Sequence, residues 1–295
     1  MNANNLLQNP RQLVFIGGGN MAEAIFGGLI ERGYPSDHIV VSEPMQERLD
    51  YLRAKFPKIR LTTDNSGAVT GEACSCSPAD VAILSVKPQV LSAVVASLKI
   101  PQKTLVFSIA AGIRASDIAR WFACDVAIVR CMPNTPALVG EGAAGLFATK
   151  NVTKEQKQLS EDIMSTVSPV VCWVENEDHI DSVTGISGSG PAYFFLFMEA
   201  MERAGIEMGL SQDMARRLSA QTCLGAAKMV LNSPDSITTL RRKVTSPNGT
   251  TEAAIKTMER LNLPNIVVEA VKAAEHRGRE LSDEFGSVEV KKNQL

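Results

Sequence analysis

LVFIGGGNMA, at residues 13–22, is a short apolar run that passes directly into glycines and then into a helical pattern. The glycines and the last alanine follow the spacing G-x-G-x-x-A. In this context Gly17 permits a tight turn, Gly19 lets the backbone approach a pyrophosphate, and Ala22 lets the helix pack close to the strand. The positive end of the helix would face the anion. The stretch therefore predicts a strand and helix that bind a dinucleotide.

The first half of the chain repeats this order of strand and helix. The run at 81–86 is apolar on both faces, as expected of a strand in a parallel sheet that is covered by helices. The pattern predicts an α/β fold with an N-terminal Rossmann-like, doubly wound sheet. Further strands are expected at 39–42, 105–109, 126–131 and 143–149.

The second half is almost wholly helical in its pattern. Strand signals stop after residues 170–174, and the acidic segment 175–178 follows. We place the domain boundary there, with a dinucleotide-binding domain over 1–175 and an all-helical substrate-binding and dimerisation domain over 176–295. Its helices are expected to open at Pro191, Ser211, Ser233–Pro234 and Thr250–Glu252, and the last is expected from Asn265 to about Leu281.

Composition narrows the function classes. The chain has 295 residues, of which 45% are hydrophobic and 21% charged, the balance of a soluble globular protein. Its 30 basic and 32 acidic residues give a net charge of −2, so nothing in the charge predicts binding to nucleic acid or to an anionic membrane. The chain lacks an apolar run of about 18 residues, and its first residues do not resemble a signal peptide. We therefore expect a cytoplasmic protein.

Metal chemistry and histidine chemistry are poorly supported. The six cysteines are scattered, and the close pair Cys74 and Cys76 does not have the C-x-x-C spacing of a zinc or redox site. The three histidines, His38, His179 and His276, are far apart in the sequence. We expect no metal site and no histidine-centred triad.

Polar residues at the ends of the predicted strands are candidates for cofactor contacts. Ser42 and Glu43 end the second strand, where an acid suits the ribose diol of NAD, and hydroxyls or cations suit the extra phosphate of NADP. Arg48 could compensate the charge of Glu43, so the preference stays open. Residues 85–88 and 109–112 end two further strands at the same edge, and Lys87 is better explained there as a site residue than as a surface lysine.

Two glycine-rich segments in the second half are each placed to open a helix. They are SGSGP at 187–191 and SPNGTT at 246–251. Each combines free backbone N–H groups, hydroxyls and the positive end of a helix dipole, and these groups bind a carboxylate without a cation. Either could be a plain helix cap. Two of them in a chain with a dinucleotide site favour a small acid as the substrate.

Together these motifs resemble pyrroline-5-carboxylate reductase. The resemblance implies reduction of the cyclic imine 1-pyrroline-5-carboxylate to L-proline by NADPH, or alternatively by NADH, as the last step of proline biosynthesis. It also implies a homodimer or larger homo-oligomer that interlocks through the helical domain. It covers residues 15 to 275 in order and spacing, and rests on 17–21, 86–88, 108–112, 130–136, 187–193 and 246–251.

The resemblance also implies a set of site residues. The cofactor contacts fall on Ile16, Gly17, Gly18, Gly19, Asn20, Met21, Ser42, Pro44, Asn65, Ser85, Val86, Lys87, Pro88, Ile109, Ala110 and Ala111. The substrate contacts fall on Glu177, Ser246, Gly249, Thr250 and Thr251.

Roles follow for some of these residues. We expect Thr251 to act catalytically through a hydrogen bond at the ring nitrogen, and residues 246–250 to hold the carboxylate. Lys87 is expected to position the cofactor. Glu177 either orients the substrate or belongs to an acidic interdomain loop. The chain departs from the family pattern where Asn248 replaces a glycine and where Glu43 stands beside the phosphate-binding serine position, although asparagine tolerates positive φ.

Other functions remain open at this point. A β-hydroxyacid dehydrogenase also joins a Rossmann domain to a helical one, but it relies on a lysine in the helical half, and the candidates Lys228 and Lys243 do not lie in that family's helix motif. A non-catalytic dinucleotide sensor would not need a second anion site at 246–251. A six-membered cyclic imine also stays open as substrate, because one methylene discriminates only about 10- to 200-fold.

Overall fold

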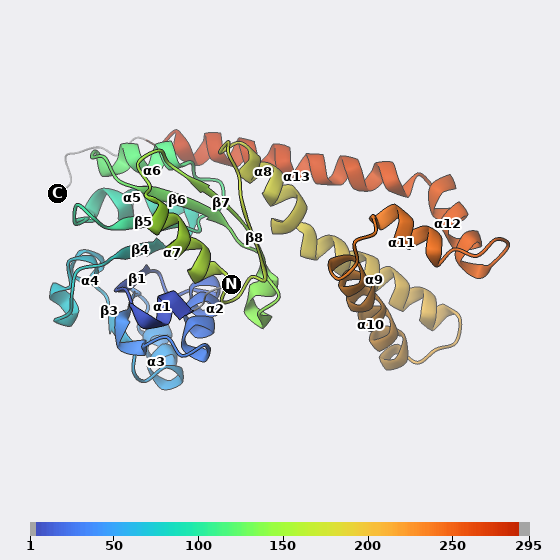
Figure 1. Ribbon diagram of the computed structural model, residues 1–295, viewed down its shortest axis with the longest axis horizontal. Coiled ribbons are helices and arrows are strands. Elements are labelled where there is room, and N and C mark those ends of the chain that lie inside the picture. Colours follow the sequence, from blue (N-terminus) through green and yellow to red (C-terminus); the bar gives the residue numbers. More distant parts are fainter. Residues whose placement is uncertain (1–3, 289–295) are drawn as a thin grey trace. The chain divides into compact units, whose positions relative to one another are not determined.

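The computed structural model describes residues 4–288, which group into two compact units (Figure 1). Among the described residues, the sheet unit contains 4–188 together with 274–288. The helical unit is Ser189–Ala273. The functional boundary expected between residues 175 and 176 stays a prediction, because the compactness of a unit does not show that it binds substrate or forms a dimer.

One sheet of eight strands, in the order β3-β2-β1-β4-β5-β6-β7-β8, forms the centre of the sheet unit. Strands β1 to β6 pair in parallel, β7 is antiparallel to β6, and β8 is parallel to β7. The strand order reverses between β1 and β4, the switch point of a doubly wound sheet, so the predicted Rossmann-like fold is confirmed. The strands are Leu13–Ile16, Ile39–Ser42, Arg60–Thr62, Val81–Leu84, Leu105–Ser108, Ile128–Met132, Ala143–Ala148 and Val170–Trp173.

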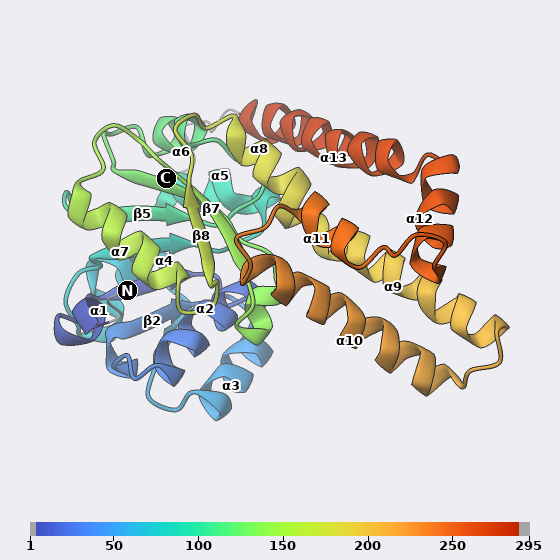
Figure 2. The same cartoon turned by 45° about the vertical axis from the view of Figure 1, so that its right-hand side comes forward.

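Helices bury both faces of this sheet (Figure 2). Along β1, Leu13 and Phe15 enter one core while Val14 and Ile16 enter the other, and all four are fully buried. This explains why the strands are continuous apolar runs in the sequence. The first core is closed by α1 (Asn4–Gln8), α2 (Asn20–Glu31), α3 (Gln46–Lys55) and α7 (Lys154–Met164), and the second by α4 (Asn65–Thr70), α5 (Pro88–Ser97) and α6 (Ala115–Phe122).

The end of the chain returns to the sheet unit. Helix α13 spans Leu263–Gly286, longer at both ends than the helix expected from Asn265 to about Leu281. Arg114, just before α6, pairs with Asp283 at 2.7 Å, and the indole N–H of Trp121 donates to the carbonyl of Val288 at 3.1 Å. These contacts attach the last part of α13 and the residues just after it to α6 and to the residue before it.

The helical unit contains α9 (Gly190–Glu207), α10 (Gln212–Leu231), α11 (Ile237–Lys243), α12 (Thr250–Arg260) and the first part of α13. A Cβ on Gly205 would lie only 2.9 Å from the Cβ of Ala215, so small residues let α9 and α10 cross closely. Ser211 caps α10 as predicted. The opening expected at Ser233–Pro234 is wrong, because the residue that caps α11 is Ser236, whose hydroxyl accepts from the Thr239 amide.

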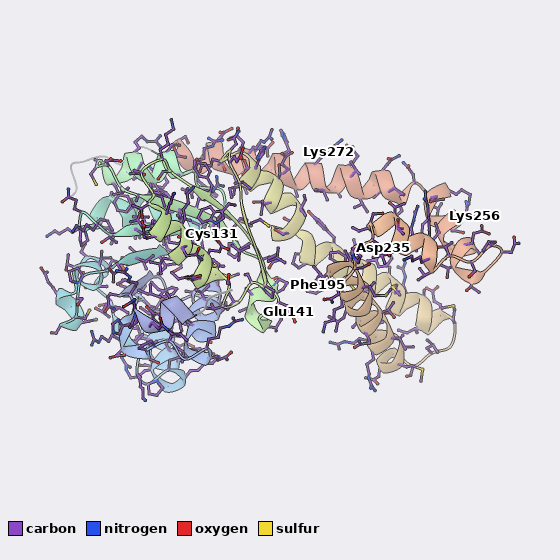
Figure 3. The ribbon with its side chains drawn as sticks, viewed as in Figure 1. Cys131, Glu141, Phe195, Asp235, Lys256 and Lys272 are labelled. Atoms are coloured by element: carbon purple, nitrogen blue, oxygen red, sulfur yellow. The ribbon has the colours of Figure 1, made fainter. Side chains whose placement is uncertain are left out.

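Helix α9 exposes a continuous run of large apolar side chains. Phe194, Phe195, Leu196 and Phe197 are all exposed, and 62% of Phe195 is accessible (Figure 3). Consecutive helical residues point to different sides of the helix, and a helix that exposes apolar side chains on several sides is typical of a protein interface. Across residues 4–288, no helix combines the length and the apolar character needed to cross a membrane.

Candidate active site

The turn between β1 and α2 requires glycine at its first position. Gly17 has φ +101°, and a Cβ there would lie 2.9 Å from the carbonyl oxygen of Ser85. Its amide donates to the carbonyl of Ser42 at 2.8 Å, which ties the turn to the end of β2. Any L side chain at this position would be strained and would push the turn away from β4.

The start of α2 is open to a ligand. Gly19 is the N-cap of α2, and no side chain of the described chain caps this end. A Cβ on Gly19 would meet no atom of the described chain within 4 Å, in contrast to Gly17. Asn20 is exposed and Met21 is half-buried at the first turn. Uncapped amides beside open space are what a pyrophosphate needs, so the residues present fit a dinucleotide.

The ends of neighbouring strands meet this turn. The Ser85 hydroxyl lies 2.9 Å from the Ile16 carbonyl and 2.8 Å from the Gly17 carbonyl, so β4 holds the glycine turn from one side. On the other side, the Ser42 hydroxyl donates to the side-chain oxygen of Asn65 at 2.6 Å. Residues expected from the sequence to share one site are thus brought together.

The remaining expected cofactor residues lie at the same edge. Lys87 is exposed and is the N-cap of α5, with Pro88 in the first turn. After β5, the amide of Ile109 donates to the carbonyl of Leu84 at 3.1 Å, Ala110 is buried and Ala111 is exposed. All these segments follow the carboxyl ends of parallel strands, where open α/β sheets bind ligands.

Glu43 has a role that the sequence did not show. Its side-chain oxygens accept hydrogen bonds from the Gly18 amide at 2.9 Å and from the Met45 amide at 3.1 Å. Only 8% of the residue is exposed. Arg48 lies nearby, where its Nε donates to the Gly18 carbonyl at 2.6 Å and its guanidinium pairs with Glu23. The signal available in the sequence was the position of Glu43 after β2, which does not predict the contact with Gly18.

Glu177 lies in the sheet unit, in a cluster around a buried arginine. The Arg130 side chain is 3% exposed and lies 3.2 Å from Glu177 and 3.6 Å from Asp181. Burial raises the pKa of the Asp181 carboxyl above its usual 3.8, against the opposing effect of Arg130. The Glu177 carboxylate also accepts the Ala115 amide at 2.6 Å, at the first residue of α6. The carboxylate thus joins β6 to α6, and its predicted contact with substrate stays a prediction.

The segment at 187–191 differs from the expectation. Helix α8 (His179–Val183) continues into a π-helical turn, Thr184–Gly188, and α9 follows at Gly190. Pro191 lies in the first turn of α9, as predicted, but the chain before α9 is already helical, so the segment is not a free helix start of the kind expected for binding a carboxylate. Asn134 fixes the turn, since its side chain donates to the Ser187 carbonyl at 3.1 Å and accepts the Ala143 amide at 2.9 Å.

The segment at 246–251, in the helical unit, does open a helix. Helix α12 begins at Thr250 with Gly249 as its N-cap, and no side chain of the described residues caps it. Asn248 adopts φ +59°, so asparagine keeps the left-handed turn, as anticipated. The Gly249 amide donates to the Ser246 carbonyl at 3.0 Å. Ser246 and Thr250 are exposed and Thr251 is half-buried, which leaves hydroxyls and amides available at one helix end.

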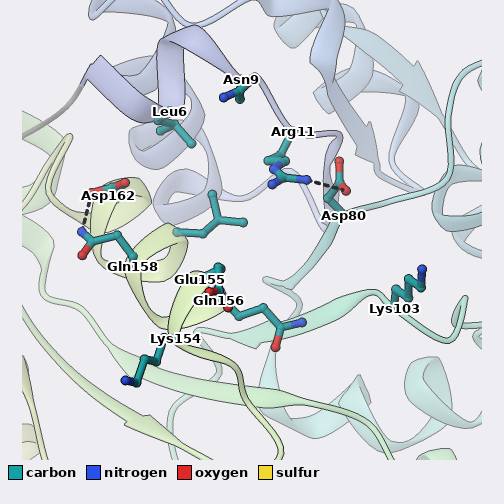
Figure 4. A pocket seen from close by; sticks show the side chains of 11 residues that line it. Leu6, Asn9, Arg11, Asp80, Lys103, Lys154, Glu155, Gln156, Gln158 and Asp162 are labelled. Atoms are coloured by element: carbon teal, nitrogen blue, oxygen red, sulfur yellow. Dashed lines mark hydrogen bonds and ion pairs between the residues drawn. The ribbon is translucent and has the colours of Figure 1, made fainter.

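A separate hollow of about 550 Å³ lies at the opposite edge of the sheet (Figure 4). Arg11, Asp80 and Lys103 line it, and these residues precede β1, β4 and β5. Arg11 and Asp80 lie 3.7 Å apart. Because it is at the amino ends of the strands, this hollow does not belong to the dinucleotide site. Among the described residues, no three His, Cys, Asp or Glu side chains gather where they could hold a metal ion.

Comparisons with known proteins agree with this arrangement. Residues 12–112 match the family model described as NADP oxidoreductase coenzyme F420-dependent, and residues 177–281 match the model for pyrroline-5-carboxylate reductase dimerisation. The chain is 43% identical over 282 residues to a pyrroline-5-carboxylate reductase of Pseudomonas aeruginosa, covering 95% of this chain and all of that protein. The chain belongs to the pyrroline-5-carboxylate reductase family.

Solved structures of the family show the same fold. The pyrroline-5-carboxylate reductase of Coxiella burnetii is 43% identical with a TM-score of 0.86, over 93% of this chain and 99% of that chain. The pyrroline carboxylate reductase of Plasmodium falciparum, solved with NADP bound, is 27% identical with a TM-score of 0.80, over 92% and 98%. Membership in the pyrroline-5-carboxylate reductase family confirms an NAD(P)-dependent oxidoreductase and decides against the β-hydroxyacid dehydrogenase and the non-catalytic sensor.

Proposed function

We propose that this chain reduces the C=N bond of 1-pyrroline-5-carboxylate with NAD(P)H to give L-proline, the last step of proline biosynthesis. The observation that carries the proposal is that each unit has an uncapped helix start in a glycine-containing turn, at Gly19 before α2 and at Gly249 before α12. The first suits a pyrophosphate and the second suits a small carboxylate. The similarity to named reductases along nearly the whole chain supports the same reaction.

The sheet unit is proposed to hold the dinucleotide, which supplies the hydride. The proposed cofactor residues lie around the open start of α2 or follow the neighbouring strand ends. They are 16–21, 85–88 and 109–111, with Ser42, Pro44 and Asn65. Lys87, exposed at the start of α5, is proposed to position the cofactor. Should Lys87→Met weaken substrate binding and leave cofactor affinity unchanged, this assignment would be wrong.

The helical unit is proposed to hold the substrate. The amides and hydroxyls of residues 246–250 hold the carboxylate, and the Thr251 hydroxyl hydrogen-bonds the ring nitrogen. A protonated cyclic imine is already electrophilic, so the protein mainly has to position it, and positioning alone can supply several kcal/mol, of order 7–11 in favourable cases. Glu177 stays proposed as a substrate contact, in addition to its bonds with Arg130 and with the α6 amide.

We further propose that the enzyme works as a homodimer or larger homo-oligomer through residues 176–295. Support comes from the match of residues 177–281 to a dimerisation model and from the exposed apolar run on α9. A cytoplasmic location without nucleic acid or membrane partners is the proposal from the balanced charge of the chain. Sedimentation of the purified protein as a monomer would contradict the oligomer.

The first experiment is the initial rate of cofactor oxidation with pyrroline-5-carboxylate, run in parallel with NADPH and NADH, with L-proline measured as the product. Matched reactions with the six-membered cyclic imino acid and with 3-hydroxy acids test the alternatives. Turnover of the five-membered imine is the expected result. Measurable cofactor binding without turnover of any imine would contradict the proposed reaction.

A further inference from the structure

Glu43 places a buried carboxylate against the glycine turn. It directly follows β2, and its two oxygens accept the amides of Gly18 and Met45 at 2.9 and 3.1 Å. The backbone therefore fixes the position of both oxygens. A carboxylate has about four acceptor positions, so two accepted hydrogen bonds leave capacity for further donors. At the end of β2 in a Rossmann fold, the donors that arrive are the ribose hydroxyls of the adenosine half.

The hydroxyl that could bind a 2′-phosphate at this strand end already has a hydrogen-bond partner. The Ser42 hydroxyl belongs to a residue that is only 1% exposed, and it donates to Asn65 at 2.6 Å. A phosphate offers only acceptors to the Glu43 carboxylate and carries the same sign of charge, so the two repel.

Arg48, which contacts the glycine turn, does not pair with Glu43. Arg48 donates through Nε to the Gly18 carbonyl, pairs with Glu23, and lies with its guanidinium carbon 4.8 Å from the centre of the Tyr51 ring. Lys55 pairs with the same Glu23 at 2.7 Å. Within residues 4–288, no ion pair joins Glu43 to a cation. The positive charge near the turn is directed at Glu23 and not at Glu43.

We propose that Glu43 makes this enzyme select against the 2′-phosphate, so that it prefers NADH to NADPH. The proposal deepens the cofactor part of the proposed function, and rests on it only in taking the glycine turn as the dinucleotide site. Both cofactors fit the pyrophosphate site at α2, and the discrimination arises at the adenosine ribose. We expect at least a tenfold difference in dissociation constant, with NADH the tighter ligand.

The test measures binding before catalysis. Dissociation constants of NADH, NADPH, 5′-AMP and 2′,5′-ADP are determined by calorimetry without imine on the full-length protein. The wild type should bind NADH and 5′-AMP at least tenfold more tightly than their phosphorylated counterparts. Equal affinity, or tighter binding of NADPH, would overturn the proposal. Because no imine is present, a preference for NADH would stand even if imine reduction failed.

Variants then assign the preference to one carboxylate. Glu43→Gln removes the charge and should reduce the NADH preference about tenfold, mainly by tightening NADPH. Glu47→Gln removes an exposed charge nearby in the sequence, in the first turn of α3, and should leave the ratio unchanged. Glu43→Asp keeps the charge and should keep the preference. An equal loss of affinity for both cofactors in Glu43→Gln would show that Glu43 only supports the turn. If that variant does not fold, the affinities of the wild type and of Glu43→Asp for NADH and NADPH still test the preference.

Discussion

The glycine turn at 17–19 and the turn at 246–249 both lead into an uncapped helix, yet they are held in different ways. The first is clamped by buried strand ends, with hydrogen bonds from Gly17 to Ser42 and from Gly18 to Glu43. The second lies mostly at the surface and is held by short-range bonds, such as the one from the Gly249 amide to the Ser246 carbonyl. A change at the clamped position Gly17 should therefore cost stability and cofactor binding together, and a change in the second turn should mainly cost catalysis.

The largest expected effect tests the clamped turn. Gly17→Val forces a β-branched residue into φ +101°, 2.9 Å from a backbone oxygen, and should weaken cofactor binding about 100-fold or more and lower Tm. Calorimetry and thermal unfolding measure the two effects. Gly19→Ala is the matched control, because its Cβ meets no atom of the described chain. It should weaken cofactor binding and leave Tm unchanged; a fall in Tm as large as that of Gly17→Val would show that the clamped backbone at Gly17 is not the cause of the lost stability.

The next effect tests whether Glu177 has a structural role. Glu177→Gln leaves Arg130 with Asp181 as its remaining partner, and should cost about 1–3 kcal/mol of unfolding free energy. Denaturant unfolding measures this cost. Glu175→Gln, two residues away, is the control, with no change expected. A rise in KM for the imine at unaltered stability would show instead that Glu177 contacts the substrate.

A smaller effect tests the surface turn. Thr251→Ala should lower kcat/KM for the imine by about tenfold, the scale of one lost transition-state hydrogen bond. Tm and the cofactor dissociation constant should not change, because Thr251 is only half-buried in the helical unit. Thr257→Ala, exposed on the same helix, is the control. Unchanged kinetics in Thr251→Ala would remove this residue from the mechanism.

The smallest effect concerns the bonds within the surface turn. Hydrogen bonds from Lys256 and from the Asn248 amide lower the pKa of the Glu252 carboxyl below its usual 4.5. A lowered folded-state pKa means that this contribution to stability is present above pH 4.5 and is lost as the pH falls through the lower value. An NMR titration should show the lowered midpoint, and Lys256→Met should return it towards 4.5. A midpoint that is unaffected by this substitution would show that Lys256 does not lower the pKa of the Glu252 carboxyl.

Local sequence signals predicted most of the framework, and their failures have physical reasons. Strands at 13–16 and 39–42 were predicted at their observed bounds because buried parallel strands are unbroken apolar runs. Strand β3, Arg60–Thr62, was missed because it is a half-buried edge of three residues. The antiparallel direction of β7 was not predicted, because an apolar pattern carries no information on chain direction. The π-helical turn at Thr184–Gly188 likewise has no local signature.

The sequence by itself determined the Rossmann-like fold, the family and the two turns, because motif spacing and periodicity act over a few neighbouring residues. Only the tertiary structure decided which groups the charged side chains contact. Gly18 and Glu43 are 25 positions apart, and Arg130 and Glu177 are 47 apart. Such contacts form when the strands and the segments that follow them pack together, so their partners follow from strand order and packing. The contacts of Glu43 and Glu177 could therefore be identified only in the tertiary structure.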